Sequence, residues 1–308
     1  MDEYQIKAYA KINLGLDVIG RLPNGYHQVK MIMQSIGLWD RLTFQKAEND
    51  IIVTTDSDLL PTDENNLIYK AAKLMKDKYG LPSGIRIQLE KHIPIAAGLA
   101  GGSTDAAATM KGINRLFHLN VSLAQLMEDG LSIGADVPYC LLGGTALAEG
   151  IGEKLTPLPP APDCYVLVAK PDIMVSTKYV YEHLDTVAGV SLSAPNPANR
   201  RSPVSDTLFH PDIDGMTEAI REGSLSGILC RMGNVLESVT IPAYPVVSAI
   251  KNRMLELGAA GSLMSGSGPT VFGIFPIEEQ KRANAALEQL RLDGLAKQIF
   301  LVTLQTSA

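Results

Sequence analysis

Residues 94 to 108 form a glycine-rich stretch whose residue types suit the binding of a phosphate group. The segment, PIAAGLAGGSTDAAA, follows a strand-like alternation over residues 85–90 and precedes apolar residues at helical spacing. Glycines let the backbone approach a ligand and adopt a positive φ, and free N–H groups at the start of a helix attract anions. We therefore expect a phosphate-binding loop here, with Ser103 or Thr104 as the N-cap of the following helix.

The loop alone is open to a second interpretation. No Gly-Lys-Ser/Thr closes it, as in a Walker A loop, and the segment does not contain the Gly-x-Gly-x-x-Gly of dinucleotide-binding folds. A turn whose small residues pack a helix against a sheet is compatible with the same glycines. The Gly-Gly-Ser-Thr cluster before an alanine-rich helix start favours phosphate binding.

Three further places carry residues that could do chemistry. Lys11 and Asn13 share one face of an extended apolar segment, which is typical of either a solvated strand face or a site. Tyr26 and His27 follow a turn at Asn24-Gly25, and a ring beside an imidazole suits either hairpin packing or stacking on a flat heterocycle. Asp136 precedes Val137-Pro138, a pattern typical of a helix N-cap, although a carboxylate between glycines is also suited to a catalytic acid near phosphates.

Composition excludes some classes of function. The chain has 308 residues, 46% of them hydrophobic, which is enough for one large or two medium domains. A net charge of −6 argues against general binding of nucleic acid or of an anionic membrane. Cys140, Cys164 and Cys230 are scattered and lack metal spacing, so we expect reduced packing residues. With neither a leader pattern nor a bilayer-spanning apolar run, we expect a soluble cytoplasmic protein.

A mixed α/β organisation in two domains is predicted. The proline-rich segment 156–163 is typical of a linker, so we place the boundary there, giving domains 1–160 and 161–308. Further predictions are strands at 29–45 with a turn near Asp40, a strand at 165–169 and a mobile loop at 191–203. Helices are expected at 63–79, 122–133, 214–236, 244–257 and 278–290, and a helix carrying Tyr181 is expected to be capped by Ser176 or Thr177. A second glycine-rich segment begins at Ser262, and a last strand is expected at 299–304.

Four segments in a fixed order resemble the GHMP small-molecule kinases: AKINLGLDV, PIAAGLAGGSTDAA, GADVPYCLLGG and MSGSGPTVFGIF. The added NGYH and GADVP resemble the branch of that family that phosphorylates a cytidine-diphosphate-linked sugar alcohol for isoprenoid synthesis. The resemblance spans almost the whole chain. It implies an ATP-dependent transferase that uses Mg²⁺, with an N-terminal domain of the ribosomal protein S5 domain 2 type and a ferredoxin-like C-terminal domain.

The resemblance also implies roles for individual residues. It places the ATP phosphates on the loop and makes Lys11 and Asp136 catalytic, with Asp136 taking or orienting the hydroxyl proton. It places the cytosine ring among Tyr26, His27 and Tyr181, with Asn13 facing the substrate. The residues predicted to contact ATP are Pro94, Ala97, Gly98, Leu99, Ala100, Gly101, Gly102, Ser103 and Thr104, with Asn66, Leu67 and Lys91 assigned to the adenine by position alone.

One departure and two alternatives accompany this prediction. Asp105 follows the loop directly, and an acid beside ATP phosphates either points away or helps to hold Mg²⁺. No metal ligand and no oligomeric state follow from the sequence. Another GHMP kinase, of the homoserine or mevalonate type, is disfavoured by Tyr26-His27, since those substrates have no heterocycle to stack. A non-catalytic sensor of the same fold is disfavoured because both Lys11 and Asp136 are present.

Overall fold

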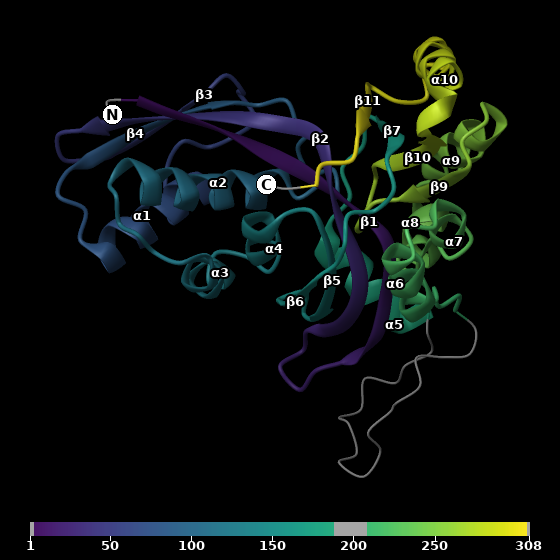
Figure 1. Ribbon diagram of the computed structural model, residues 1–308, viewed down its shortest axis with the longest axis horizontal. Coiled ribbons are helices and arrows are strands. Elements are labelled where there is room, and N and C mark those ends of the chain that lie inside the picture. The colour runs from purple at the N-terminus through teal and green to yellow at the C-terminus, as the bar shows by residue number, and fades with distance from the viewer. Residues whose placement is uncertain (1–2, 188–207, 307–308) are drawn as a thin grey trace.

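Two β-sheets with helices packed on them make up the protein (Figure 1). The computed structural model describes residues 3–187 and 208–306. Its strands are β1 Glu3–Arg21, β2 His27–Ala47, β3 Ile51–Thr55, β4 Gly84–Glu90, β5 Thr145–Gly150, β6 Lys154–Pro157, β7 Cys164–Lys170, β8 Gly233–Asn234, β9 Gly261–Met264, β10 Val271–Pro276 and β11 Gln298–Thr303. Its helices are α1 Leu67–Tyr79, α2 Gly101–Leu116, α3 Leu123–Leu131, α4 Val137–Leu142, α5 Thr177–Val187, α6 Ile213–Arg221, α7 Leu225–Leu229, α8 Glu237–Ala243, α9 Val246–Glu256 and α10 Gln280–Asp293, with a 3₁₀ turn, η1, at Ile277–Glu279.

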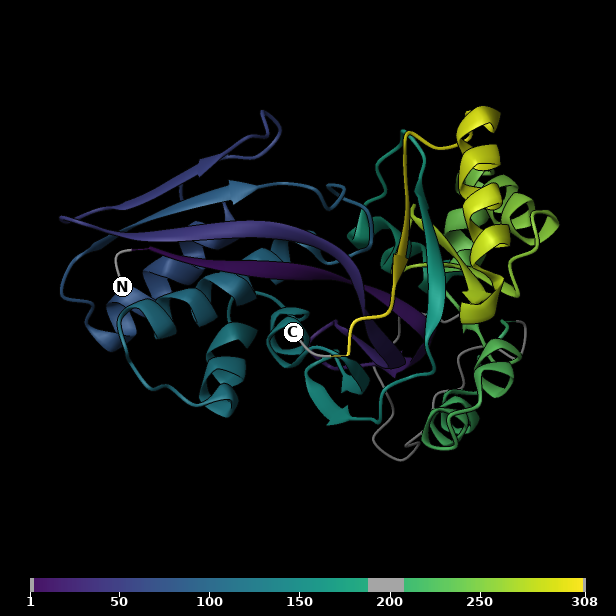
Figure 2. The ribbon, with the colours of Figure 1, turned by 45° about the horizontal axis from the view of Figure 1, so that its top comes forward.

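The first sheet is built on a long hairpin of β1 and β2. Its order is β3-β4-β2-β1-β8, and β5 and β6 extend it from β2. Both long strands curve across the molecule (Figures 1 and 2). The pairing of β1 with β2 shifts register between Tyr9 and Lys11 and again between Asn13 and Gly15. Such irregularities bend a strand and redirect its side chains, so they set where Lys11 and Asn13 point.

The turn predicted near Asp40 is wrong, since β2 runs through it without a break. Asp40 is fully buried, and its carboxylate accepts hydrogen bonds from the backbone N–H groups of His92 (2.6 Å) and Ile93 (2.8 Å). Lys91 pairs with the same carboxylate. Asp40 therefore accepts the hydrogen bonds of the backbone N–H groups that follow β4. Its local sequence does not indicate this long-range role.

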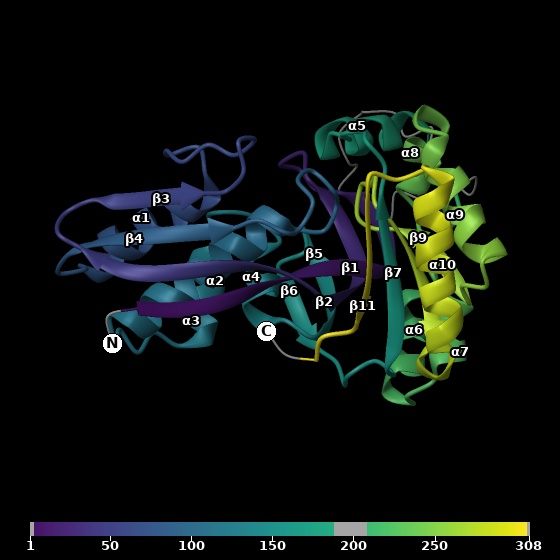
Figure 3. The same ribbon diagram turned by 90° about the horizontal axis from the view of Figure 1, so that it is seen from above.

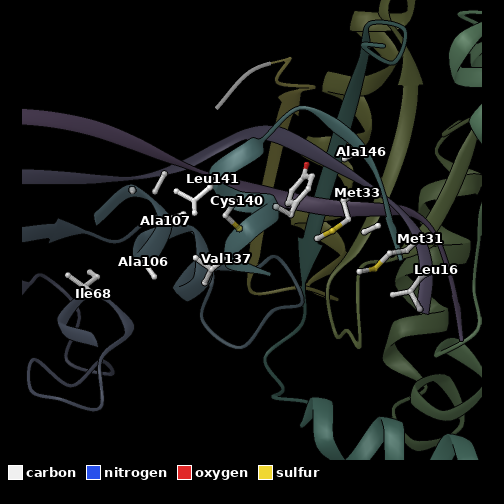
Figure 4. Close-up of a cluster of buried hydrophobic side chains, with 14 of the residues drawn as sticks. Leu16, Met31, Met33, Ile68, Ala106, Ala107, Val137, Cys140, Leu141 and Ala146 are labelled. Atoms are coloured by element: carbon white, nitrogen blue, oxygen red, sulfur yellow. The ribbon is translucent and has the colours of Figure 1, made fainter. Parts of the chain in front are cut away.

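Helices α1 and α2 pack together against this sheet, and α4 packs on α2 (Figure 1). Small side chains bring them close: Ala106, Ala107 and Val137 lie in one buried cluster with Leu141 (Figure 4). The approach of α2 to β2 depends on Gly112, where a Cβ would lie 2.5 Å from the ring of Phe44. This packing fixes the direction in which the N-terminus of α2 points.

The second sheet is antiparallel, in the order β11-β7-β10-β9. Numbered in chain order, β7, β9, β10 and β11 are strands 1, 2, 3 and 4 of this sheet. Their order across the sheet is therefore 4-1-3-2, that of a ferredoxin-like fold. Helices α9 and α10 cover one side of it (Figure 3). The predicted α/β class with a ferredoxin-like second part is confirmed, whereas the division at residue 160 stays a prediction.

Several local predictions need correction. The helix predicted at 214–236 is two helices, α6 and α7, followed by the short strand β8, which pairs with β1. Helix α1 begins at Leu67, not at Asp63, because Asn66 is its N-cap. Cys140 and Cys164 are buried as expected, but Cys230 is exposed. Residues 191–203, predicted as a loop, lie outside the described residues.

No helix in the described ranges has the length and apolarity needed to cross a bilayer.

Candidate active site

The N-terminus of α2 provides unpaired backbone donors at the glycine loop. The helix begins at Gly101, after Ala100 at φ 57°, so the expectation of Ser103 or Thr104 as N-cap is wrong. The first helix-closing bond runs from the N–H of Thr104 to the carbonyl of Ala100, over 2.8 Å. Within the described ranges, nothing accepts from the N–H groups of Gly101, Gly102 and Ser103. Three donors at a helix start form a suitable site for an anion.

Hydrogen bonds to β1 hold this loop in place. The backbone N–H of Lys11 donates to the carbonyl of Leu99 over 3.1 Å. The Thr104 hydroxyl donates to the carbonyl of Tyr9 over 2.8 Å, so it braces the helix rather than facing outward. The Ser103 hydroxyl, in contrast, has no partner among the described residues. Pro94, Ala97 and Leu99 are buried, so their contribution to a site is the shape of the backbone.

Residues 265–270, the loop of the second glycine-rich segment, pack directly against the first segment. A Cβ at Gly98, whose φ is 73°, would lie 2.2 Å from the carbonyl oxygen of Ser265. A Cβ at Gly266 would lie 3.5 Å from Nζ of Lys11. The amide of Asn234, on β8, donates to the carbonyls of Met264 (2.9 Å) and Gly266 (2.8 Å) and so fixes the segment. Two glycine loops from different halves of the chain thus border Lys11.

Lys11 and Asn13 are buried, so a solvated strand face is wrong for both. Nζ of Lys11 donates to Oδ1 of Asn13 over 2.8 Å, and Nδ2 of Asn13 lies 3.2 Å from Sδ of Met31. Lys11 forms no ion pair with any carboxylate in the described part of the chain. A buried ammonium without a carboxylate partner is suited to neutralising negative charge on a ligand.

Asp136 has a carboxylate that its own helix does not use. It is the N-cap of α4, but its side chain makes no capping hydrogen bond. Burial raises the pKa of the Cys140 thiol, the Asp136 carboxylate raises it further and Lys11 lowers it. Burial also raises the pKa of Tyr181, and Asp136 adds to that shift. The Asp136 carboxylate is therefore near enough to both Cys140 and Tyr181 to influence the pKa of each.

Only some of the residues predicted to bind the cytosine ring lie close together. The rings of His27 and Tyr181 lie 5.1 Å apart between centroids. Nε2 of His27 lies 2.7 Å from Oδ1 of Asp185, which also pairs with Arg21 at 3.3 Å. Tyr26 is 59% exposed. Sequence reasoning missed Asp185, although its spacing of four residues from Tyr181 places both on one face of α5.

The residues assigned to the adenine side have different surroundings. Leu67 borders the loop, 3.3 Å from the Cβ position of Gly102. The side chain of Asn66 is occupied in capping α1, accepting from the N–H of Ile68 over 2.8 Å and donating to the carbonyl of Pro61 over 2.6 Å. Lys91 lies beneath Gly101, with its ammonium 2.9 Å from the Cβ position of that glycine. Of the three, only Leu67 presents an uncommitted surface to the loop.

Asp105 pairs with Lys91. It is buried, and its Oδ2 lies 3.3 Å from Nζ of Lys91. Burial raises the pKa of Asp105 well above its usual range, Lys91 lowers it and Asp40 raises it further. Its Oδ1 has no hydrogen-bond partner. Among the residues that the structure describes, no group of three or more His, Cys, Asp or Glu side chains could hold a metal ion.

Comparison with known proteins shows the family of this chain. The family described as "GHMP kinases N terminal domain" matches residues 66–144, and "GHMP kinases C terminal" matches residues 210–294. A 4-diphosphocytidyl-2-C-methyl-D-erythritol kinase from Lachnospira eligens is 54% identical over 97% of this chain and 98% of its own length. The chain belongs to the GHMP kinase family. A kinase of the same name from Enterococcus faecalis is 46% identical over 96% of this chain and 97% of its own.

Solved structures of GHMP kinases share the fold. A 4-(cytidine 5'-diphospho)-2C-methyl-D-erythritol kinase is similar with a TM-score of 0.77, at 32% identity over 98% of this chain and 99% of that chain. A homoserine kinase from Cytophaga hutchinsonii gives 0.75 at 21% identity, covering 100% of this chain and 96% of that chain. At 21% identity, the similarity to the homoserine kinase shows a shared fold and nothing more. This GHMP kinase therefore has its glycine loops, Lys11 and Asp136 on a scaffold that serves several kinases.

Proposed function

We propose that this GHMP kinase transfers the γ-phosphoryl group of ATP to a hydroxyl of 4-diphosphocytidyl-2-C-methyl-D-erythritol, in the non-mevalonate route to isoprenoid precursors. The observation that carries the proposal is the Asp136 carboxylate, which makes no capping hydrogen bond in its own helix and is near enough to Cys140 and Tyr181 to raise the pKa of both. The full-length relatives that bear that enzyme's name support the choice of substrate.

The phosphates of ATP would lie at the start of α2. The unpaired N–H groups of Gly101, Gly102 and Ser103 donate to phosphate oxygens there, and the helix dipole favours the negative charge. Gly98 and Gly266 let the two loops pack closely beside this point, since a Cβ at either would meet the backbone of the other loop. Leu67 beside Gly102 offers an apolar contact for the adenine.

Lys11 and Asp136 would act on the acceptor hydroxyl. Asp136 accepts a hydrogen bond from the hydroxyl, orients it for in-line attack and takes its proton as the new bond forms. Lys11, held by Asn13 and without an acidic partner in the described ranges, lowers the free energy of the charge that develops on the transferring phosphoryl group. Positioning and charge neutralisation are the main requirements of phosphoryl transfer.

Mg²⁺ fits the oxygen donors near this point. The ion prefers oxygen ligands and commonly binds through one or two protein groups together with substrate phosphates. The Ser103 hydroxyl is free among the described residues and lies 3.9 Å from the Cβ position of Gly134, two residues before Asp136. The Ser103 hydroxyl would hold the ion together with phosphate oxygens, and the ion would supply neutralising charge to the phosphates when bound. Asp105 is excluded from this role because it is buried against Lys91.

The cytosine would lie against Tyr181 and His27. Asp185 fixes the imidazole of His27 by a 2.7 Å hydrogen bond, so that the ring presents a defined edge to a heterocycle. Tyr26, exposed at the hairpin tip, would cover the base from the solvent side. The net charge of −6 supports a small-molecule substrate rather than a nucleic acid.

A substrate panel tests the proposal. Purified protein with Mg²⁺ and ATP is offered 4-diphosphocytidyl-2-C-methyl-D-erythritol, mevalonate and homoserine, and ADP release is followed. We expect turnover with the cytidine compound alone. Turnover with mevalonate or homoserine instead would be consistent with ATP binding at the glycine loop but would contradict the cytosine pocket. Silence with all three would favour a sensor that binds without catalysis.

A further inference from the structure

A groove of about 770 Å³ lies between the edge of β1 and the C-terminal half of α2. Tyr4, Lys7 and Tyr9 line it from β1, and Lys111, Arg115 and His118 line it from α2 and the turn that follows. β1 is the outer strand of the sheet here, on the side where the N-terminus lies (Figure 3). None of the residues placed above at the phosphates, the acceptor hydroxyl or the base lines this groove.

The groove carries positive charge that no acid cancels. Of the described residues that line it, none is Asp or Glu. Aromatic rings, rather than carboxylates, hold two of its cations: Nζ of Lys7 lies 4.3 Å from the centroid of the Trp39 ring, and the guanidinium of Arg115 lies 5.2 Å from that of Tyr4. Contacts of this kind orient a cation and leave its charge available. In a protein of net charge −6 this is a local exception.

Lys111 is a partly buried cation that has no counter-charge among the described residues. Its side chain is partly buried, and no acceptor in the described ranges bonds to it. Burial lowers the pKa of its ammonium, and Cys140 opposes that shift. An anion in the groove would supply the missing counter-charge.

The backbone of β1 adds donors to the same side. β8 pairs with β1 only at Gly15 and Leu16, so residues before the first register shift form a free sheet edge. The carbonyl of Tyr9 points outward from that edge, where it accepts from Thr104. Alternation along the strand places the N–H of Lys7 on the same side. A lysine at an edge also discourages pairing with another strand, but that does not account for Lys111 and Arg115, which come from α2.

We propose that this groove is a binding site for a small molecule carrying two or more phosphate charges, separate from the site of phosphoryl transfer. Its volume falls in the range of small-ligand sites. Lysine and arginine together with a backbone N–H are the usual partners of phosphate oxygens. The rings of Tyr4 and Tyr9 provide apolar walls for the rest of such a molecule.

Calorimetric titration with inorganic pyrophosphate tests this site. The glycine loop is first filled with a saturating non-hydrolysable ATP analogue, so that the remaining heat reports binding elsewhere. We expect saturable binding at a single site, weakened about tenfold or more in Lys111→Met and in Arg115→Gln. Lys281→Met, at an exposed position on α10, is the matched control and should bind like the wild type. Emission from Trp39, the only tryptophan of the chain, should change on binding because Lys7 lies on its ring.

Three outcomes would overturn the proposal. They are no binding once the ATP analogue is present, equal affinity in Lys111→Met and Arg115→Gln, and equal loss in Lys281→Met, which would indicate general charge attraction. Arg115 is exposed, so its substitution leaves folding intact even if that of Lys111 does not. Because no acceptor alcohol is used, the result is independent of the substrate panel described above.

Discussion

The hydroxyl of Ser265 donates a hydrogen bond of 3.0 Å to the carbonyl oxygen of Gly98. The two residues are 167 positions apart in the chain, and each lies in one of the two glycine-rich segments. This bond joins the loop before α2 to the loop between β9 and β10 beside Lys11. The geometry of the phosphate site therefore depends on both halves of the chain.

Loss of that bond should weaken ATP binding. Ser265→Ala leaves the carbonyl of Gly98 without its partner, so we expect a stability loss of about 1–2 kcal/mol. We also expect the KM for ATP to rise about threefold to tenfold with a smaller change in kcat. Thr270→Val, on the same segment, is the control because the Thr270 hydroxyl is buried without a partner, so its removal should cost little. Equal effects from the two variants would contradict the role of Ser265.

Two glycines with positive φ should respond differently to alanine. At Gly80 (φ 61°) a Cβ would meet nothing within 4 Å, so Gly80→Ala should cost only the backbone strain of about 1–2 kcal/mol. At Gly98 (φ 73°) the Cβ would lie 2.2 Å from the carbonyl oxygen of Ser265, so the loops must separate. We expect Gly98→Ala to lose ATP binding in a calorimetric titration. Retention of wild-type affinity would show that the loops need not touch.

The base pocket can be tested with two tyrosines of one helix. Tyr181 faces His27, whereas Tyr179 stacks on His183 at 3.8 Å and is exposed. Tyr181→Ala should raise the KM for the cytidine substrate by about tenfold or more, since one stacked base contributes about 1–3 kcal/mol. Tyr179→Ala should leave the KM unchanged. A KM that moves equally in both, or in neither, would remove Tyr181 from the pocket.

An alkaline stability measurement tests the cluster between α1 and α3. The hydroxyl of Tyr79 donates to Asp129 over 2.5 Å. Burial, followed by that hydrogen bond, raises the pKa of Tyr79 to about 12. Because the folded pKa exceeds the unfolded value of about 10, the contribution is complete below pH 10 and is lost as the pH rises towards 12. In urea unfolding, the free energy of Tyr79→Phe should fall less steeply over that window than that of the wild type. Parallel curves would contradict the shift.

Local pattern predicted the elements that depend on local physics. The strand at residues 85–90 and the turn at Asn24-Gly25 are both present, because alternation and glycine conformation act within a few residues. The glycine loop lies at a helix start, as predicted, although α2 begins three or four residues earlier than a cap at Ser103 or Thr104 would give. Its entry through Ala100 at φ 57° depends on tertiary packing rather than on a side-chain cap.

What local pattern missed depends on partners far away in the chain. Asp40 has the character of a turn residue, but it is a buried acceptor for the chain after β4. The orientation of Asp105 is set by Lys91, which comes from another strand end. Asp185 is joined to His27 across 158 positions. Neither the spacing nor the type of such residues indicates their partner until the sheets are assembled.

The most direct test of the account is the activity of Asp136→Asn. Asparagine keeps the shape of the side chain but cannot take the proton of the acceptor hydroxyl. We predict a kcat for the cytidine substrate lower by about 10²–10⁴, the usual contribution of a general base, and a Kd for ATP within about twofold of the wild type. A kcat near that of the wild type would contradict the placement of the reacting hydroxyl at Asp136.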